Sequence, residues 1–215
     1  MEIYETEEEQ VAAIKAWWKE NGQSALIGLG IGIIGILGWN YWQDYRKDQA
    51  LQASGLYSDL LKTVDTDNKA SINTLAEKIK TDFAGSHYAA YSDLMMAKVK
   101  IQQNDLAGAK AILEQLTKNS DKEISNIARI RLVRLMLANK EYEQGLQVIN
   151  TVDPSSTASY SGLYDELTGD LYVALDRLDL ARTSYQNAQR NGQQSPLLQM
   201  KIDDLTLPEK LDSSK

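Results

Sequence analysis

"GDLYVALDRLDLARTSYQNA", residues 169–188, carries the spacing that decides the fold of this chain. Small residues and tyrosines alternate in it at fixed intervals: Gly169, Tyr172, Ala181, Tyr185 and Ala188. In a pair of antiparallel helices, small residues let the two backbones approach, and large aromatic residues fill the seam with the next pair. Gly169 and Ala181 therefore predict a helical hairpin, and the two tyrosines predict its packing against a neighbour.

The same arrangement recurs earlier in the chain at a constant interval. The segments DLAGA, EYEQG and RLDLA place small residues 36 positions apart, at Ala109, Gly145 and Ala181. Self-similarity at such a period is typical of solenoids, in which each unit packs on its neighbours. Each unit has the pattern of two amphipathic helices joined by a short polar turn. The turns are 102–105, 138–141 and 175–178.

Further elements extend the repeats on both sides. A weaker hairpin is predicted from about 45 to 83, and a capping helix is predicted to begin near Ser195 and Pro196. The run 153–156, Asp-Pro-Ser-Ser, breaks the chain between the second unit and the third. Strand-forming runs are nearly absent, so we expect an all-α domain.

The spacing G-x2-Y-x8-A-x3-Y-x2-A of the last unit resembles the tetratricopeptide repeat. Three features depart from that repeat. Asp165 and Thr168 stand where it has a tryptophan and a leucine, its closing proline comes late at Pro196, and the period is 36 instead of about 34. These departures predict a divergent α-solenoid.

A second stretch, "SALIGLGIGIIGILGWNYW" at 24–42, contains no charged residue. As a helix it is roughly 28 Å long, close to the thickness of about 30 Å of a bilayer's hydrocarbon core. All four tryptophans of the chain lie at its two ends, as interfacial aromatic residues do: Trp17 and Trp18 before it, and Trp39 and Trp42 in its last turn. A buried helix is disfavoured by its five glycines, and a cleaved signal peptide by the acidic start MEIYETEEEQ. We expect a single N-terminal transmembrane helix.

The predicted division of the chain is therefore an amphipathic tail at 1–23, a transmembrane helix at 24–42 and a helical domain at 43–215. The tail has the pattern of a short helix of its own, ended by Asn21 and Gly22. A stripe of small residues in the anchor predicts close packing on a partner's transmembrane helix, although glycine tolerated by the bilayer is the alternative. The stripe consists of Gly28, Gly32 and Gly35.

The chain has few of the residue types that commonly carry out catalysis. The chain has no cysteine and one histidine, His87, so it offers neither thiol chemistry nor a site with several histidine ligands. Its net charge of -7, without clustered cations, disfavours nucleic-acid binding. The sequence predicts neither an enzyme nor a catalytic, metal or cofactor site, and no nucleic-acid partner.

Several segments together resemble the YfgM-type family of ancillary subunits of the bacterial Sec translocon. They are the opening MEIYE, Gln10-Val11, Glu-Asn-Gly before the anchor, GWNYW after it, the repeats and the closing MKIDDL. The resemblance implies a single-pass inner-membrane protein with a cytoplasmic N-terminus and a periplasmic repeat domain. It implies as partners the SecYEG translocon, the membrane-anchored periplasmic chaperone PpiD and exported polypeptides, which the protein would assist.

The charge pattern leaves the orientation in the lipid bilayer open. Lys15 and Lys19 precede the anchor, and Arg46 and Lys47 follow it, so the rule that counts basic residues gives a tie. The alternative function, from another class, is a self-associating structural or assembly scaffold of the inner membrane.

The resemblance to tetratricopeptide repeats also predicts a binding surface. In such solenoids the first helix of each hairpin lines a concave groove. Carried onto these repeats, that register places seven residues in the groove: Tyr91, Leu94, Lys98, Ile130, Arg134, Glu166 and Asp170. Apolar anchors mixed with both charge signs suit a protein surface or an extended chain. Leu94 and Ile130 are alternatively ordinary packing residues.

Overall fold

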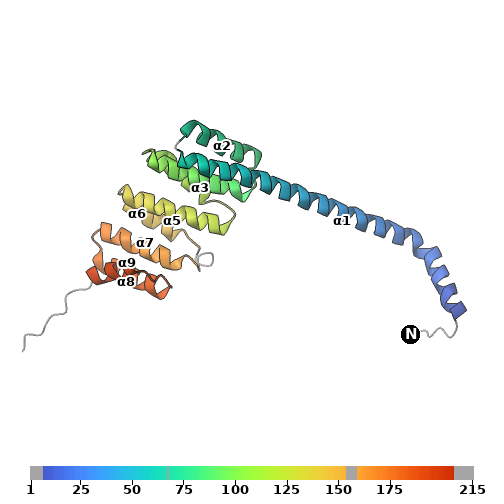
Figure 1. Ribbon diagram of the computed structural model, residues 1–215. Coiled ribbons are helices and arrows are strands. Elements are labelled where there is room, and N and C mark those ends of the chain that lie inside the picture. Colours follow the sequence, from blue (N-terminus) through green and yellow to red (C-terminus); the bar gives the residue numbers. More distant parts are fainter. Residues whose placement is uncertain (1–6, 67, 154–158, 206–215) are drawn as a thin grey trace, which may run out of the picture. The chain divides into compact units, whose positions relative to one another are not determined.

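The computed structural model describes residues 7–66, 68–153 and 159–205, and within them it is helical and contains no strand (Figure 1). The chain divides into two compact units, residues 1–55 and 56–215. The all-α prediction is confirmed.

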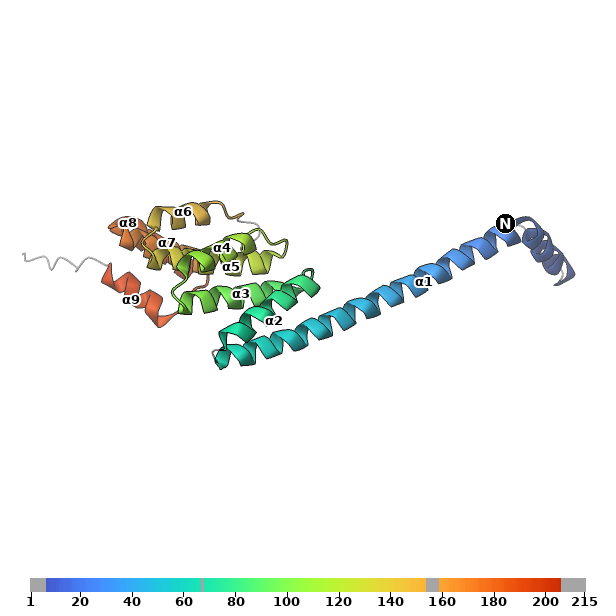
Figure 2. The same cartoon turned by 90° about the horizontal axis from the view of Figure 1, so that it is seen from above.

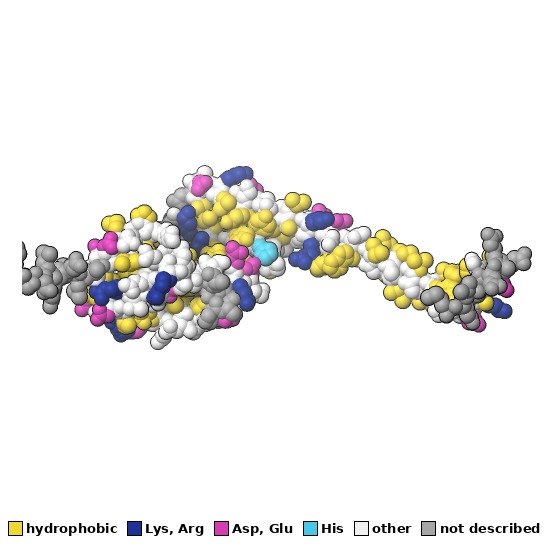
Figure 3. All heavy atoms as spheres, turned by 90° about the horizontal axis from the view of Figure 1, so that it is seen from below, with side chains coloured by type: hydrophobic (Ala, Val, Ile, Leu, Met, Phe, Trp, Pro, Cys, Tyr) yellow, Lys and Arg dark blue, Asp and Glu magenta, His cyan; other side chains and the backbone are white. Residues whose placement is uncertain are grey.

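The first unit is formed by helix α1, Glu7–Asp65, whose last turns belong to the second unit. The apolar side chains of its anchor segment are exposed; Leu26 is 57% exposed and Ile34 71%. Figure 3 shows hydrophobic side chains along this part of the helix. By length and composition, α1 is long and apolar enough to cross a membrane.

The separate tail helix predicted before Asn21 and Gly22 is wrong, because α1 runs through both residues without interruption. The Asn21 amide donates to the carbonyl of Trp17 one turn earlier, at 3.2 Å, and so bonds along the helix. The ring of Trp18 lies over Gly22, at 3.2 Å from where a Cβ would stand. Gly22 therefore leaves room for an aromatic ring instead of ending the helix.

Within the described residues, the second unit contains the end of α1 and eight further helices. They are α2 (Lys69–Asp82), α3 (His87–Gln102), α4 (Leu106–Leu116), α5 (Lys122–Ala138), α6 (Tyr142–Asn150), α7 (Ser161–Ala174), α8 (Leu178–Arg190) and α9 (Pro196–Asp204). Figure 1 shows them stacked side by side from α2 to α8 and α9. From above (Figure 2), α3 and α9 lie on the side away from α6 and α8. The predicted hairpins, turns and capping helix are confirmed; the predicted break at 153–156 lies mostly outside the described residues.

Side-chain caps begin several of these helices where the sequence provides a short polar residue. The Asp105 carboxylate accepts a hydrogen bond from the Gly108 N–H at 2.9 Å, and Asp121 accepts from Glu123 and Ile124. Ser195 caps α9 in the same way, with Pro196 in the first turn. Such caps satisfy amide groups that the first turn of a helix leaves free.

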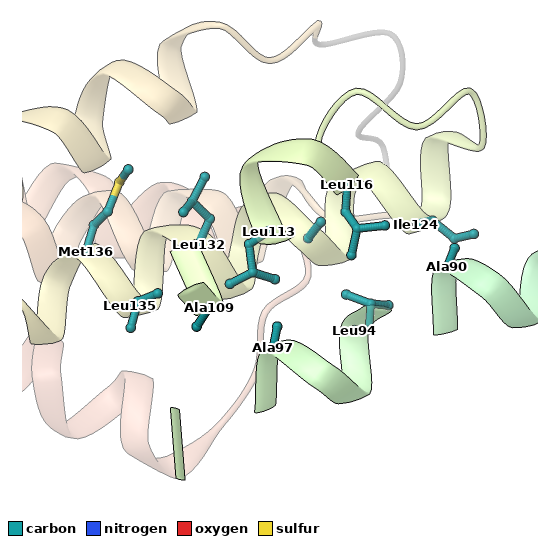
Figure 4. Packing of buried hydrophobic residues seen from close by; sticks show 11 residues of the cluster. Ala90, Leu94, Ala97, Ala109, Leu113, Leu116, Ile124, Leu132, Leu135 and Met136 are labelled. Atoms are coloured by element: carbon teal, nitrogen blue, oxygen red, sulfur yellow. The ribbon is translucent and has the colours of Figure 1, made fainter. Parts of the chain in front are cut away.

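The core runs continuously from hairpin to hairpin. Figure 4 shows Leu94 and Ala97 of α3 pointing toward Leu113 of α4, and this cluster continues into α5. A second cluster joins α5, α6 and α7, and Tyr172 packs on both it and the cluster of α8 and α9. Burying each large aliphatic side chain contributes about 1.5–3 kcal/mol, so the units stabilise one another through shared residues.

The turn inside each repeated hairpin contains, at the equivalent position, one residue with a left-handed backbone conformation. Among the described residues, three that are not glycine have a positive φ, and they are 36 positions apart: Asn104 (60°), Lys140 (62°) and Asp176 (58°). At the first, the Asp105 N–H donates to the Lys100 carbonyl at 2.8 Å; at the second, the Glu141 N–H donates to that of Met136. This pattern is the Schellman motif, which normally places glycine at the left-handed position.

We expect Lys140→Gly to raise the free energy of unfolding by about 1 kcal/mol, because glycine adopts the left-handed conformation without the steric cost that lysine has. Asn104→Gly, its matched control, should gain less, since asparagine tolerates this conformation. Urea unfolding of the full-length protein in detergent measures both. Equal gains, or none at Lys140, would contradict this account.

Candidate functional site

A groove lies between α3 and α5 and has a volume of about 420 Å³. Its floor is apolar and includes Leu113 of α4, which is fully buried, and Leu135 of α5. The wall residues come from α3 and α5: Leu94, Ala97, Lys98, Ile101, Gln102, Arg131, Arg134 and Ala138. The helical spacing explains the α3 wall, because residues 94, 98 and 101 recur on one face of a helix.

Three of the seven predicted groove residues meet here, namely Leu94, Lys98 and Arg134. Leu94 is only 6% exposed and also belongs to the core, so it is a packing residue at the groove wall. Lys98 and Arg134 are exposed. The sequence reasoning missed Arg131, although its position three residues before Arg134 places it on the same helix face. Its Nη1 donates to the Leu94 carbonyl at 3.2 Å.

A cluster of three tyrosines, one from the end of α1 and two from the first turns of α3, lies next to this groove. Tyr57, Tyr88 and Tyr91 pack with ring centroids 5.9 to 6.2 Å apart, and Tyr88 and Tyr91 meet edge to face. Tyr91, a predicted groove residue, is 40% exposed. Figure 3 shows hydrophobic side chains beside His87 (cyan), with basic side chains on the same face. Burial raises the pKa of Tyr57, and the nearby positive charge of Arg131 partly offsets this.

The pair Glu166 and Asp170, also predicted for the groove, is engaged inside the protein instead. The Lys201 ammonium of α9 lies 2.8 Å from Glu166 and 2.7 Å from Asp170, and the side chains of all three are at most 24% exposed. Asp170 also accepts a hydrogen bond from the Tyr185 hydroxyl at 2.8 Å. Neither carboxylate is therefore open to a ligand, as the groove prediction requires. Sequence periodicity could not reveal this ion pair, because Lys201 of α9 lies 31 residues from Asp170 in the chain.

The pKa of Lys201 is raised: burial works against its charge, but hydrogen bonds and the charges of Asp170 and Glu166 outweigh it. A raised lysine pKa contributes stability that is complete at neutral pH and is lost as the pH rises above the ordinary value of 10.5. We expect Lys201→Met to cost about 2 kcal/mol of unfolding free energy at pH 7. The difference from wild type should shrink above pH 10.5 in urea titrations. A difference independent of pH would refute the ionic explanation.

Ile130, the remaining predicted groove residue, is 5% exposed and packs with Leu146 and Tyr164 in the core of the second unit. It offers no surface to a ligand. The alternative interpretation of ordinary packing therefore describes Ile130. Helical periodicity could not tell a groove residue from a core residue here, because the same face of α5 both packs on its neighbours and lines the groove.

The glycine stripe of the anchor is unobstructed in the described structure. A Cβ built at Gly28, Gly32 or Gly35 would have no other atom within 4 Å, apart from its immediate neighbours along the chain and the helix's own backbone. These positions therefore leave the backbone open to another helix. No group of three or more His, Cys, Asp or Glu side chains that could hold a metal ion occurs among the described residues.

Comparison with known proteins agrees with this architecture. The family model of a tetratricopeptide repeat-like domain matches residues 15–207. The ancillary SecYEG translocon subunit of Haemophilus influenzae is 31% identical over 202 residues, which is 93% of this chain and 97% of that protein. The protein of the same name from Escherichia coli K12 is 28% identical over 211 residues, 96% of this chain and 100% of its own.

The relative of this name from Neisseria gonorrhoeae is 27% identical over 207 residues, with 93% of this chain and 97% of its own length covered. No solved structure matches this chain. The names of these relatives denote an accessory subunit and not an enzyme. Together with the long apolar helix α1, they indicate a membrane-anchored protein. Because the family model and the relatives cover most of its length, this chain belongs to the tetratricopeptide repeat-like family of ancillary SecYEG translocon subunits.

Proposed function

We propose that this protein is a membrane-anchored interaction module that associates with the SecYEG translocon and assists exported polypeptides together with a periplasmic chaperone of the PpiD type. The observation that carries the proposal is the combination of an exposed apolar anchor with a helical solenoid that has an open groove. Solenoids of this kind present extended surfaces to other proteins. The names of the relatives supply the translocon as the partner.

The proposed orientation has the N-terminus in the cytoplasm and the repeat domain in the periplasm of a bacterial inner membrane. The lipid bilayer surrounds the segment 24–42, where the apolar side chains of α1 are exposed. Protease added to spheroplasts should digest the repeats and leave an N-terminal tag intact. Protected repeats with a digested tag would reverse the orientation.

The partners can be tested by purifying the tagged full-length protein from membranes in a mild detergent. The expected result is stoichiometric recovery of SecYEG and of the PpiD-type chaperone. Recovery of the protein with only copies of itself would instead support the self-associating scaffold. A variant with Lys98→Glu and Arg134→Glu tells whether the groove contributes to chaperone recovery, since both side chains are exposed.

The anchor is proposed to contact a partner's transmembrane helix through Gly28, Gly32 and Gly35. Replacing these three by leucine keeps the segment apolar and long enough to insert but fills the space where a second helix would approach. We expect the variant to insert into the membrane normally. The recovery of SecYEG should fall about fivefold, which corresponds to about 1 kcal/mol of lost helix packing. Gly30→Leu, on the opposite face of the helix, provides the control. Unchanged recovery in the triple variant would assign the stripe to lipid.

A further inference from the structure

The groove between α3 and α5 has an unbalanced charge. Three cations line it, Lys98, Arg131 and Arg134, and no acidic side chain of the described residues does. Its apolar floor lies beside these cations, and so does the tyrosine cluster, in which Tyr91 is 40% exposed. An apolar ligand that also carries negative charge would therefore match this surface.

Two acidic side chains at the starts of neighbouring helices are held by other partners. Asp105 is 2.6 Å from Lys100, and Glu141 bonds to Lys110, which lowers the pKa of each carboxyl group. These contacts direct the carboxylates away from the groove, since neither of them nor their partners line it.

The acids predicted for the groove from the third repeat do not balance its cations either. Glu166 and Asp170 are bound by Lys201 of α9. By contrast, Lys98 and Arg134 form no ion pair within the part of the chain that the structure describes. Lys98 and Arg134 are thus available to a ligand, whereas Glu166 and Asp170 are not.

We infer that this groove binds an extended polypeptide segment in which acidic residues flank apolar or aromatic ones. The apolar side chain occupies the floor over Leu113, and the carboxylates bind Lys98 and Arg134. The tyrosine cluster receives a second apolar side chain. The face from Tyr91 to Gln102 rises about 16 Å along α3, the length of roughly five extended residues. The inference rests on the proposed function and specifies the chemistry of the segment that the solenoid takes.

Fluorescence anisotropy of the full-length protein in detergent micelles tests it with a labelled peptide of the pattern Asp-Leu-Ser-Tyr-Glu-Ser, in which the two apolar side chains share one face of an extended chain. The control peptide has lysine in place of both acids. The wild-type protein should bind the acidic peptide at least roughly tenfold more tightly, and the preference should weaken with added salt. Equal binding of the two peptides, or none by either, would overturn the inference.

The matched variants change the same number of charges inside and outside the groove. Lys98→Glu with Arg134→Glu should weaken binding of the acidic peptide roughly tenfold, whereas Lys78→Glu with Lys122→Glu, both exposed elsewhere, should leave it within about twofold. The milder pair Lys98→Gln and Arg134→Gln should weaken binding as well and guards against misfolding, which circular dichroism monitors. Unchanged binding in the groove variants would place the site elsewhere. Failure of peptide binding with intact SecYEG recovery would refute this inference alone.

Discussion

Replacing Gly169 with valine should lower the free energy of unfolding by about 3 kcal/mol, at the upper end of what overpacking a core costs. A Cβ at this position would stand 2.3 Å from Cε1 of Tyr185, well inside contact distance. The ring cannot yield easily, because Tyr185 is 2% exposed and its hydroxyl donates to Asp170. Urea unfolding of the full-length protein in detergent gives the measurement.

Gly55→Val is the matched control, since Gly55 also lies within a helix but has nothing within 4 Å of a built Cβ. It should change stability by only a few tenths of a kcal/mol, because valine is a slightly better helix former than glycine. A double-mutant cycle with Tyr185→Ala isolates the contact. If valine at position 169 costs as much without the tyrosine ring as with it, the steric explanation is wrong.

Leu113→Ala should destabilise the repeat domain by about 3 kcal/mol, within the range of 2–5 kcal/mol for such truncations. Leu113 is fully buried between α3, α4 and α5, where its neighbours cannot collapse onto an alanine without moving a helix. For a domain of this size the melting temperature should fall by roughly 6–12 °C. Thermal melts followed by circular dichroism measure the change.

The control for this truncation is Leu180→Ala, because Leu180 is 49% exposed. Its removal should change stability by less than about 0.5 kcal/mol, as most surface substitutions do. Equal losses at the two leucines would show that burial in the shared core does not govern the stability of this domain.

The sequence alone determined the helical hairpins of the repeat domain and their order. The 36-residue spacing of Ala109, Gly145 and Ala181 predicted the hairpins, because small residues at a fixed period are needed wherever paired helices touch. The uncharged run at 24–42 predicted the anchor from its length and its flanking tryptophans. Both predictions rest on features that can be read along the chain; the structure confirms the hairpins and contains, among its described residues, one helix, α1, that is long and apolar enough to cross a membrane.

The continuity of α1 was decided by contacts along the helix that the sequence pattern did not reveal. Asn21 and Gly22 commonly end helices, yet here the Asn21 amide bonds to the Trp17 carbonyl and the Trp18 ring covers Gly22. Whether such residues end a helix depends on the partners that their neighbours offer.

The composition of the groove was decided by tertiary structure. Helical register correctly placed Lys98 and Arg134 on an exposed face, but it could not distinguish Ile130, which the next hairpin buries. Nor could it show that Lys201, which α9 carries back onto α7, binds the acids predicted to face a ligand. Sequence periodicity fixes which side of one helix a residue occupies, whereas packing between helices decides which of those sides remain open and which charges remain unpaired.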